Sequence, residues 1–178
     1  MTDRTDELVE ALANAFPTSI IDSTLRDEPS ANWSVYDDVA DLESIWGKSW
    51  QELPAEALVR HATLPIYAGD QLFHAIVPAF LRHVLLEDRR VDELPFQLAG
   101  QLTRSDELDR QPKFDRRAAL FTPAQRATVR DVLAHLSSRP AIDEPMARAM
   151  ETWDPLAGDA VACAATRIQR RASNRLIL

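Results

Sequence analysis

The sequence predicts an all-α fold, a single compact multi-helix domain over residues 1–178 with about six or seven helices around one proline-kinked central helix. Apolar residues from Asp70 to Leu86 repeat at three- and four-residue steps, which is typical of a helix with a wide buried face. Pro78 removes one backbone donor in the middle of that run, so we expect the helix to kink or restart there. A length of 178 residues suits one domain that buries about 70% of its unfolded surface.

Before the central helix, apolar spacing and proline positions predict short elements. These are a helix from Asp3 or Thr5 to Phe16, a loop with at most one short strand over residues 18–34, a helix from Val35 to Trp50, and a helix opened by Pro54 and closed by Pro65.

After the central helix, the sequence predicts further helices and one mobile loop. The elements are a helix through Leu94, Leu98 and Leu102, a polar mobile stretch from Thr103 to Arg117, a helix after Phe121, a short helix from Met146 to Trp153, and a last helix from Asp154 to about residue 171. Thr122 as N-cap, Pro123 and Gln125 form the clearest helix start in the chain. The helices of residues 143–178 are expected to pack on the same core.

The negative charge of the chain is concentrated at its N-terminal end. Residues 1–60 hold 13 acidic side chains against 4 basic ones, and residues 121–178 hold 6 against 8. A surface of that sign repels nucleic acids and anionic lipids and attracts a basic protein, although it can also serve solubility alone. The net charge of −8 disfavours DNA binding through the arginines of the C-terminal tail.

Two further features indicate a cytoplasmic protein outside the membrane. No apolar run approaches the ~20 residues that a membrane span needs, and the first residues are polar and acidic rather than those of a signal peptide. The single Cys163 cannot form an internal disulfide, and its alanine-rich surroundings favour a buried role.

Catalytic and metal-binding patterns are weak throughout the sequence. Gly47-Lys48-Ser49 resembles the end of a phosphate-binding loop, but Leu42 stands where that loop needs its first glycine. Asp70 with His74 and Asp131 with His135 have helical spacing, which surface hydrogen bonds explain better than a shared metal. We therefore predict no catalytic residues, no metal and no cofactor.

Three motifs in a fixed order resemble a family of small, mostly bacterial proteins known as a domain of unknown function. The motifs are Gly47-Lys48-Ser49-Trp50, then Leu72-Phe73 with Val77-Pro78-Ala79-Phe80-Leu81, then Phe121-Thr122-Pro123-Ala124-Gln125 with Val129 and Leu133. The resemblance spans about residues 8–137. Residues 73–76 depart from the tyrosine-rich pattern of that family, and the resemblance implies no catalytic residues.

Two functional hypotheses follow from the sequence. The first is a non-enzymatic protein-binding protein, such as the cytoplasmic immunity partner of a bacterial toxin, which binds a basic toxin domain. Its partner-binding residues would be Asp37, Asp38, Asp41, Glu43 and Trp46. The alternative is a small enzyme or ligand-binding domain with a pocket at the Pro78 kink. That pocket would be lined by Trp50, Tyr67, His74 and Pro78. The sequence predicts neither the oligomeric state nor the identity of the partner.

Overall fold

The computed structural model describes residues 3–36, 39–87, 93–140 and 142–154, and these residues form the predicted all-α fold. Its α-helices are α1 (Arg4–Ala15), α2 (Ala55–Arg60), α3 (Leu64–Tyr67), α4 (Asp70–Leu86), α5 (Glu93–Leu102), α6 (Gln111–Leu120) and α7 (Pro123–Leu136). Its 3-10 helices are η1 (Ser23–Asp27), η2 (Trp33–Val35), η3 (Val39–Ser44) and η4 (Trp50–Glu52). Residues 143–154 are also helical. The helix predicted beyond Asp154, with Cys163, lies outside the described residues.

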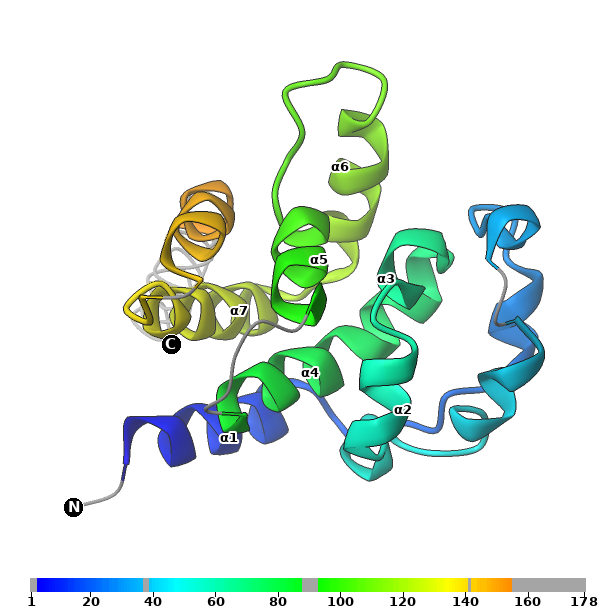
Figure 1. Ribbon diagram of the computed structural model, residues 1–178, viewed down its shortest axis with the longest axis horizontal. Helices are drawn as coiled ribbons and strands as arrows, with labels where there is room; N and C mark the ends of the chain where they lie inside the picture. The colour runs from blue at the N-terminus through cyan, green and yellow to red at the C-terminus, as the bar shows by residue number, and fades with distance from the viewer. Residues whose placement is uncertain (1–2, 37–38, 88–92, 141, 155–178) are drawn as a thin grey trace, which may run out of the picture.

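Helix α4 lies at the centre of the fold and contacts all of the helices from α1 to α7, as well as η1 and η4. Figure 1 shows α1 and α7 at one side of the molecule and the 3-10 segments at the other, with α4 running between them. Of the two outcomes predicted for Pro78, a kink or a restart, the restart does not occur: α4 continues through the proline, and residues before and after it are buried on the same core. One long helix therefore joins the N-terminal third of the chain to the rest.

Within the core, aromatic rings from α4 and from three distant segments meet around Phe121. Phe121 has its ring centroid 5.9 Å from that of Phe16, 6.4 Å from Phe73 and 5.1 Å from Trp153, each in an edge-to-face arrangement. Such arrangements are favourable for aromatic pairs beyond the area that they bury. Phe121 precedes the predicted capping box, which is confirmed: Thr122 N donates to Gln125 Oε1 at 2.8 Å and Gln125 N donates to Thr122 Oγ1 at 3.3 Å.

The prediction of a helix from Val35 to Trp50 is wrong for most of that segment. The chain forms η3 and then turns at Gly47, whose φ of 74° lies in the left-handed region that glycine adopts easily. Long-range backbone pairing explains the turn, because Gly47 N donates to Ile21 O at 3.0 Å and Ile21 N donates to Lys48 O at 2.8 Å. The short strand considered near residue 20 reduces to an isolated bridge between Ile20 and Ser49.

The prediction of a mobile loop from Thr103 to Arg117 is also wrong, since its second half forms α6. Pro112 lies in the first turn of α6, where its missing N–H costs no helical hydrogen bond. Phe114, Arg117 and Ala118 then face the core. Pro65, predicted to end a helix, lies in the first turn of α3 for the same reason.

Within the described part of the chain, no helix is both long enough and apolar enough to cross a membrane.

Candidate functional site

The acidic residues predicted to bind a partner are only partly described. Asp37 and Asp38 lie outside the described residues, and Asp41 is described only as part of the backbone of η3. Glu43, on the same 3-10 helix, is exposed to solvent. Trp46 is half-buried and packs against the core. The structure thus places Asp41 and Glu43 on one short element close in sequence to an anchored tryptophan.

The side chains proposed to line a pocket at Pro78 have other neighbours. Trp50 is buried, and its indole N–H donates to the carbonyl oxygen of Phe16 at 3.2 Å. His74 has its Nε2 atom 3.1 Å from Gln125 Oε1, and its ring also lies near Phe16. Tyr67 instead lies beside Tyr36, with a centroid distance of 5.4 Å. The structure therefore brings Trp50 and His74 near one another through Phe16, while Pro78 is buried within α4.

The two helical Asp and His pairs are separated and have different partners. Asp70 pairs with Arg116 and Arg117, and Asp131 pairs with Arg130. His135 Nε2 lies 3.4 Å from the hydroxyl of Thr5. Among the described residues, no three His, Cys, Asp or Glu side chains are grouped as metal ligands would be.

A fully buried histidine, His61, forms a polar cluster that the sequence did not single out. Its Nδ1 atom lies 2.7 Å from the hydroxyl of Tyr36, and its Nε2 atom lies 3.5 Å from Ser44 Oγ. Tyr36 in turn contacts the rings of Trp33 and Tyr67. With both ring nitrogens engaged and no exposed surface, His61 ties α2 to the 3-10 segments.

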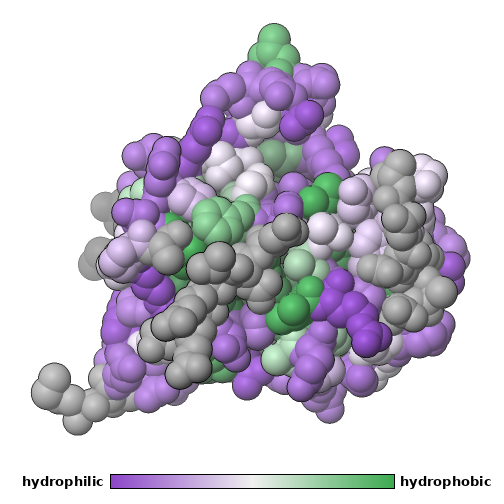
Figure 2. All heavy atoms as spheres, in the orientation of Figure 1, coloured by the Kyte–Doolittle hydropathy of each residue, from purple (hydrophilic) through white to green (hydrophobic). Residues whose placement is uncertain are grey.

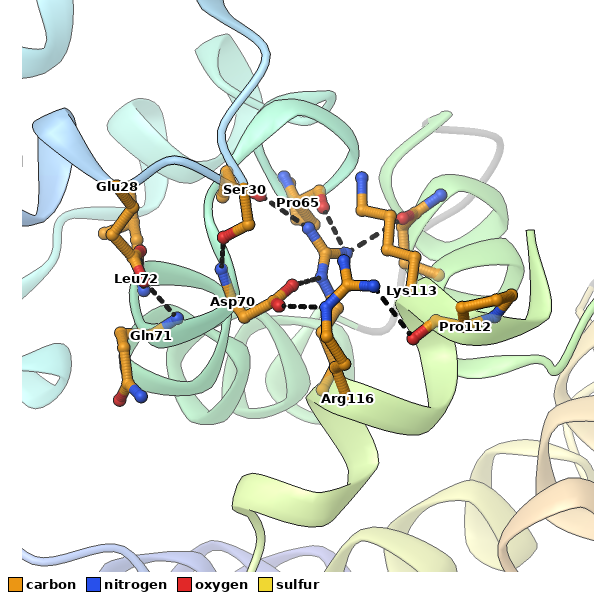
Figure 3. Close-up of polar contacts among 12 residues, drawn as sticks. Glu28, Ser30, Pro65, Asp70, Gln71, Leu72, Pro112, Lys113 and Arg116 are labelled. Atoms are coloured by element: carbon orange, nitrogen blue, oxygen red, sulfur yellow. Dashed lines mark hydrogen bonds and ion pairs between the residues drawn. The ribbon is translucent and has the colours of Figure 1, made fainter. Parts of the chain in front are cut away.

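A polar site joins α6 to the start of α4 (Figure 3). The buried Arg117 connects its parts. Arg117 Nη1 donates to Pro65 O at 2.9 Å and Nη2 donates to Ala68 O at 2.6 Å. The Cζ atom of its guanidinium lies 4.1 Å from the ring centroid of Phe73. Its Nε atom donates to Asp70 Oδ1 at 3.4 Å. Burial lowers the pKa of Arg117 to about 10, so the side chain remains charged at neutral pH.

The same carboxylate of Asp70 binds a second arginine from α6. Arg116 Nε donates to Asp70 Oδ2 at 2.9 Å, so each oxygen of Asp70 faces one guanidinium. Figure 3 shows Asp70 pointing from α4 toward Arg116, with Lys113 rising from α6 nearby. Lys113 Nζ donates to the carbonyl oxygen of Ile66 at 2.6 Å. Burial, and secondly the charge of Arg117, lowers the pKa of Lys113 to about 8.

The first turn of α4 is capped from a distance by the N-terminal third of the chain. Glu28 accepts hydrogen bonds from Gln71 N at 2.9 Å and Leu72 N at 3.0 Å, and Ser30 Oγ accepts one from Asp70 N at 2.9 Å. A carboxylate is favourable at this end of a helix because of the helix dipole. A Cβ atom at Gly69 would clash with the Glu28 side chain, whose own Cβ would lie 2.6 Å away, so the cap requires glycine there.

A hollow of about 390 Å³ lies on the other side of α6. Its lining residues are Arg104, Phe114, Asp115, Ala118, Ala119, Arg126 and Thr152. The hollow is within the volume range of small-molecule sites, but two of its charged groups are paired with each other. Arg104 donates to both oxygens of Asp115, at 2.9 Å and 3.1 Å, and this hydrogen bonding lowers the pKa of Asp115.

The structural roles of Arg117, Lys113 and Glu28 were missed because the sequence predicted loops for the segments that contain them, residues 103–117 and 18–34. A usable signal was present for Arg117, since Phe114, Arg117 and Phe121 are spaced three and four residues apart, as on one face of a helix.

Comparison of the chain with protein-family models, curated proteins and solved structures finds no match.

Proposed function

We propose that this chain is a non-enzymatic, cytoplasmic protein-binding protein whose partner is a basic protein domain, and that it acts as the immunity partner of a bacterial toxin. The observation that carries the proposal is a set of unpaired carboxylates in residues 3–60. Among the side chains of this region that the structure describes, nine acidic ones are exposed, and five of the nine are unpaired. The exposed ones are Asp3, Asp6, Glu7, Glu10, Asp22, Asp27, Glu43, Glu52 and Glu56.

Most of these carboxylates have no role in holding the fold together. Asp3, Asp22 and Glu52 accept backbone hydrogen bonds at helix starts, and Glu7 pairs with Arg4. The remaining five make no hydrogen bond or ion pair with any other described residue: Asp6, Glu10, Asp27, Glu43 and Glu56. Carboxylates that are exposed and unpaired are available to a cationic partner.

Exposed apolar residues offer less support for a docking surface. The large exposed apolar side chains of the described residues are on separate segments: Ile20, Val59, Leu86, Phe96 and Leu108. Figure 2 shows a largely hydrophilic face on which apolar residues form separate small areas. Charge is therefore the stronger basis for recognition, and opposite charges act mainly by accelerating encounter between partners.

The test is the kinetics of binding to a basic toxin domain encoded beside this gene. Association with the intact chain would be measured by surface plasmon resonance at low and high salt. We expect association to slow as salt increases, because the Debye length falls below about 8 Å above physiological ionic strength. Reversal of three of the unpaired carboxylates to lysine, Glu10, Asp27 and Glu43, should slow association further, with the thermal melting temperature unchanged.

The matched control reverses the same number of exposed carboxylates outside the first sixty residues to lysine: Asp109, Glu144 and Glu151. This variant should associate at a rate close to that of the unmodified chain. If the reversed chain, the control and the unmodified chain associated at equal rates at all salt concentrations, the acidic surface would not take part in binding. Its charge would then contribute to solubility alone.

A further inference from the structure

Lysine is rare in this chain, and its two lysines occupy contrasting surroundings. Only Lys48 and Lys113 occur among 20 basic residues. Both are partly buried, and both donate to a backbone carbonyl: Lys48 to Ser44 O at 2.7 Å and Lys113 to Ile66 O at 2.6 Å. The two amines therefore share a neutral acceptor and can be compared by the groups around them.

Lys113 has cations around it and no carboxylate of its own. Arg116 and Arg117, on the same helix, each hold one oxygen of Asp70, which is the carboxylate facing this cluster from α4. Glu28 acts on Arg117 but is engaged by the first amides of α4. Among the described residues Lys113 makes no ion pair, and its acceptor at Ile66 is a neutral carbonyl.

We propose that Lys113 is a site of acyl modification, at which its side-chain amine attacks activated carboxylic acids of the acyl phosphate class. The geometry favours the neutral amine, because Lys113 is half-buried on α6 three and four residues before Arg116 and Arg117, and the carboxylate of this cluster, Asp70, is already held by those two guanidinium groups. Conversion to an amide removes that charge. The amide nitrogen keeps one hydrogen, so it can still donate to Ile66 O.

The protonation equilibrium of Lys113 supports this reactivity. Burial first, and then the charges of Arg117 and Arg116, lowers its pKa to about 8, against a partial opposite effect of Asp70. At pH 7.5 an amine of that pKa is neutral in about a quarter of molecules, whereas an ordinary lysine is neutral in about one in a thousand. The nucleophilic form is thus present before any reagent binds.

The reaction is a simple acyl transfer. The nitrogen lone pair of Lys113 attacks the carbonyl carbon of the acyl phosphate and forms a carbon–nitrogen bond. The bond between the carbonyl carbon and the phosphate oxygen breaks, and inorganic phosphate leaves with its electron pair. The nitrogen then loses a proton to solvent, which leaves an amide and changes no oxidation state.

Lys48 provides the internal control because its surroundings have the opposite sign. It lies close enough to Glu52 that its charge contributes to lowering the pKa of that carboxylate. Any difference in labelling between two partly buried lysines with similar acceptors therefore reports the burial and the charges around each amine.

The experiment treats the full chain with acetyl phosphate at pH 7.5 and follows each lysine by peptide mass spectrometry, which also separates the N-terminal amine. Lys113 is expected to be acetylated at least tenfold faster than Lys48, and the two should react at similar rates in denaturing urea. Between pH 7 and 10 the rate at Lys113 should level off above about pH 8, the pKa given by the fold. Acetylation of Lys113 at or below the rate of Lys48 in the folded protein would overturn the proposal.

A pair of variants tests the cause of the reactivity. Arg116→Gln removes one cation and releases an oxygen of Asp70 toward the amine, so Lys113 should react severalfold more slowly. Arg148→Gln is the control, because it removes an exposed arginine from an ion pair with Asp106 elsewhere on the surface. Equal Lys113 rates in the two variants would reject the cationic cluster as the source of the reactivity.

Discussion

Most described carboxylates from α4 to α7 pair with arginines, whereas most of those in the first sixty residues do not. In the first region, Asp6, Glu10, Asp27, Glu43 and Glu56 are exposed and unpaired within the described chain. In the second, Asp70, Asp106, Asp115 and Asp131 all pair with arginines. The arginines of the second region are therefore largely engaged inside their own region and do not offset the N-terminal charge. A net charge alone does not reveal this separation.

The backbone differs between the two regions as well. The first region has four 3-10 helices and relies on distant hydrogen bonds, such as those that Glu28 accepts from the start of α4. The second region is built mainly from longer α-helices that pack on one another. Each of the following experiments tests whether the two regions depend on each other in the way that these contacts indicate.

Loss of the common core should have the largest effect. Phe80 is fully buried on α4, which contacts both regions. Phe80→Ala should cost about 3 to 5 kcal/mol of unfolding free energy, because a buried aromatic ring loses its transfer energy and leaves a cavity. Urea denaturation followed by circular dichroism measures this change. A loss below about 1 kcal/mol would mean that the two regions do not share this core.

Removal of the buried arginine should be the next most damaging change. Arg117→Leu leaves the carbonyl oxygens of Pro65 and Ala68 without their buried donor, at a cost of about 3 kcal/mol. Arg116→Leu is the control, since the Arg116 side chain is 56% exposed and surface ion pairs contribute about 1 kcal/mol or less. Similar losses in both variants, measured by urea denaturation, would contradict the importance of burial at this site.

The cap that Glu28 provides for α4 should contribute less to the free energy of unfolding than Phe80 or Arg117 does. Glu28→Ala removes the acceptor for Gln71 N and Leu72 N, and caps of this kind are worth about 1 to 2 kcal/mol. Hydrogen exchange at those two amides should become faster in the variant. Asp27→Ala, at an exposed neighbouring carboxylate, should leave their exchange unchanged. If the amides of Gln71 and Leu72 exchanged as slowly in Glu28→Ala as in Asp27→Ala, the first region would not stabilise the start of α4.

The smallest expected effect on stability comes from His135, which lies where α7 contacts α1. Burial, followed by the charges of Arg139 and Arg4, lowers the pKa of His135 in the folded protein. The unfolded chain therefore takes up this proton at higher pH, and stability should fall as pH decreases below about 6.5 until the lowered pKa is passed. His135→Gln should reduce this slope in urea midpoints between pH 5 and 7. An unchanged slope would assign the pH dependence to other groups.

Local signals in the sequence were sufficient for the elements that depend on neighbouring residues. The apolar spacing of α4 and the capping box of Thr122 and Gln125 both involve residues within a few positions, and both predictions are confirmed. The segment from Val35 to Trp50 could not be predicted in this way. Its turn depends on pairing with Ile21, more than twenty residues earlier, which no local pattern records.

The polar site at α6 shows why functional residues were harder to predict than helices. An arginine next to another arginine resembles solvent-exposed charge, and only the tertiary fold provides the carbonyls of Pro65 and Ala68 that allow Arg117 to be buried. The pKa of Lys113 is likewise set by groups from two helices. The acidic partner-binding residues and the pocket at Pro78 remain predictions of the sequence.

The contacts of Arg117 also bear on the time for which the protein stays folded. They connect positions 47, 49 and 52 residues apart, so they form only after a long loop has closed. We expect them to be absent from the folding transition state, and this can be tested by stopped-flow measurements on Arg117→Leu. Contacts that form after the transition state slow unfolding while leaving the folding rate nearly unchanged. The Arg117 guanidinium would then act mainly by slowing unfolding, which lengthens the lifetime of the folded chain.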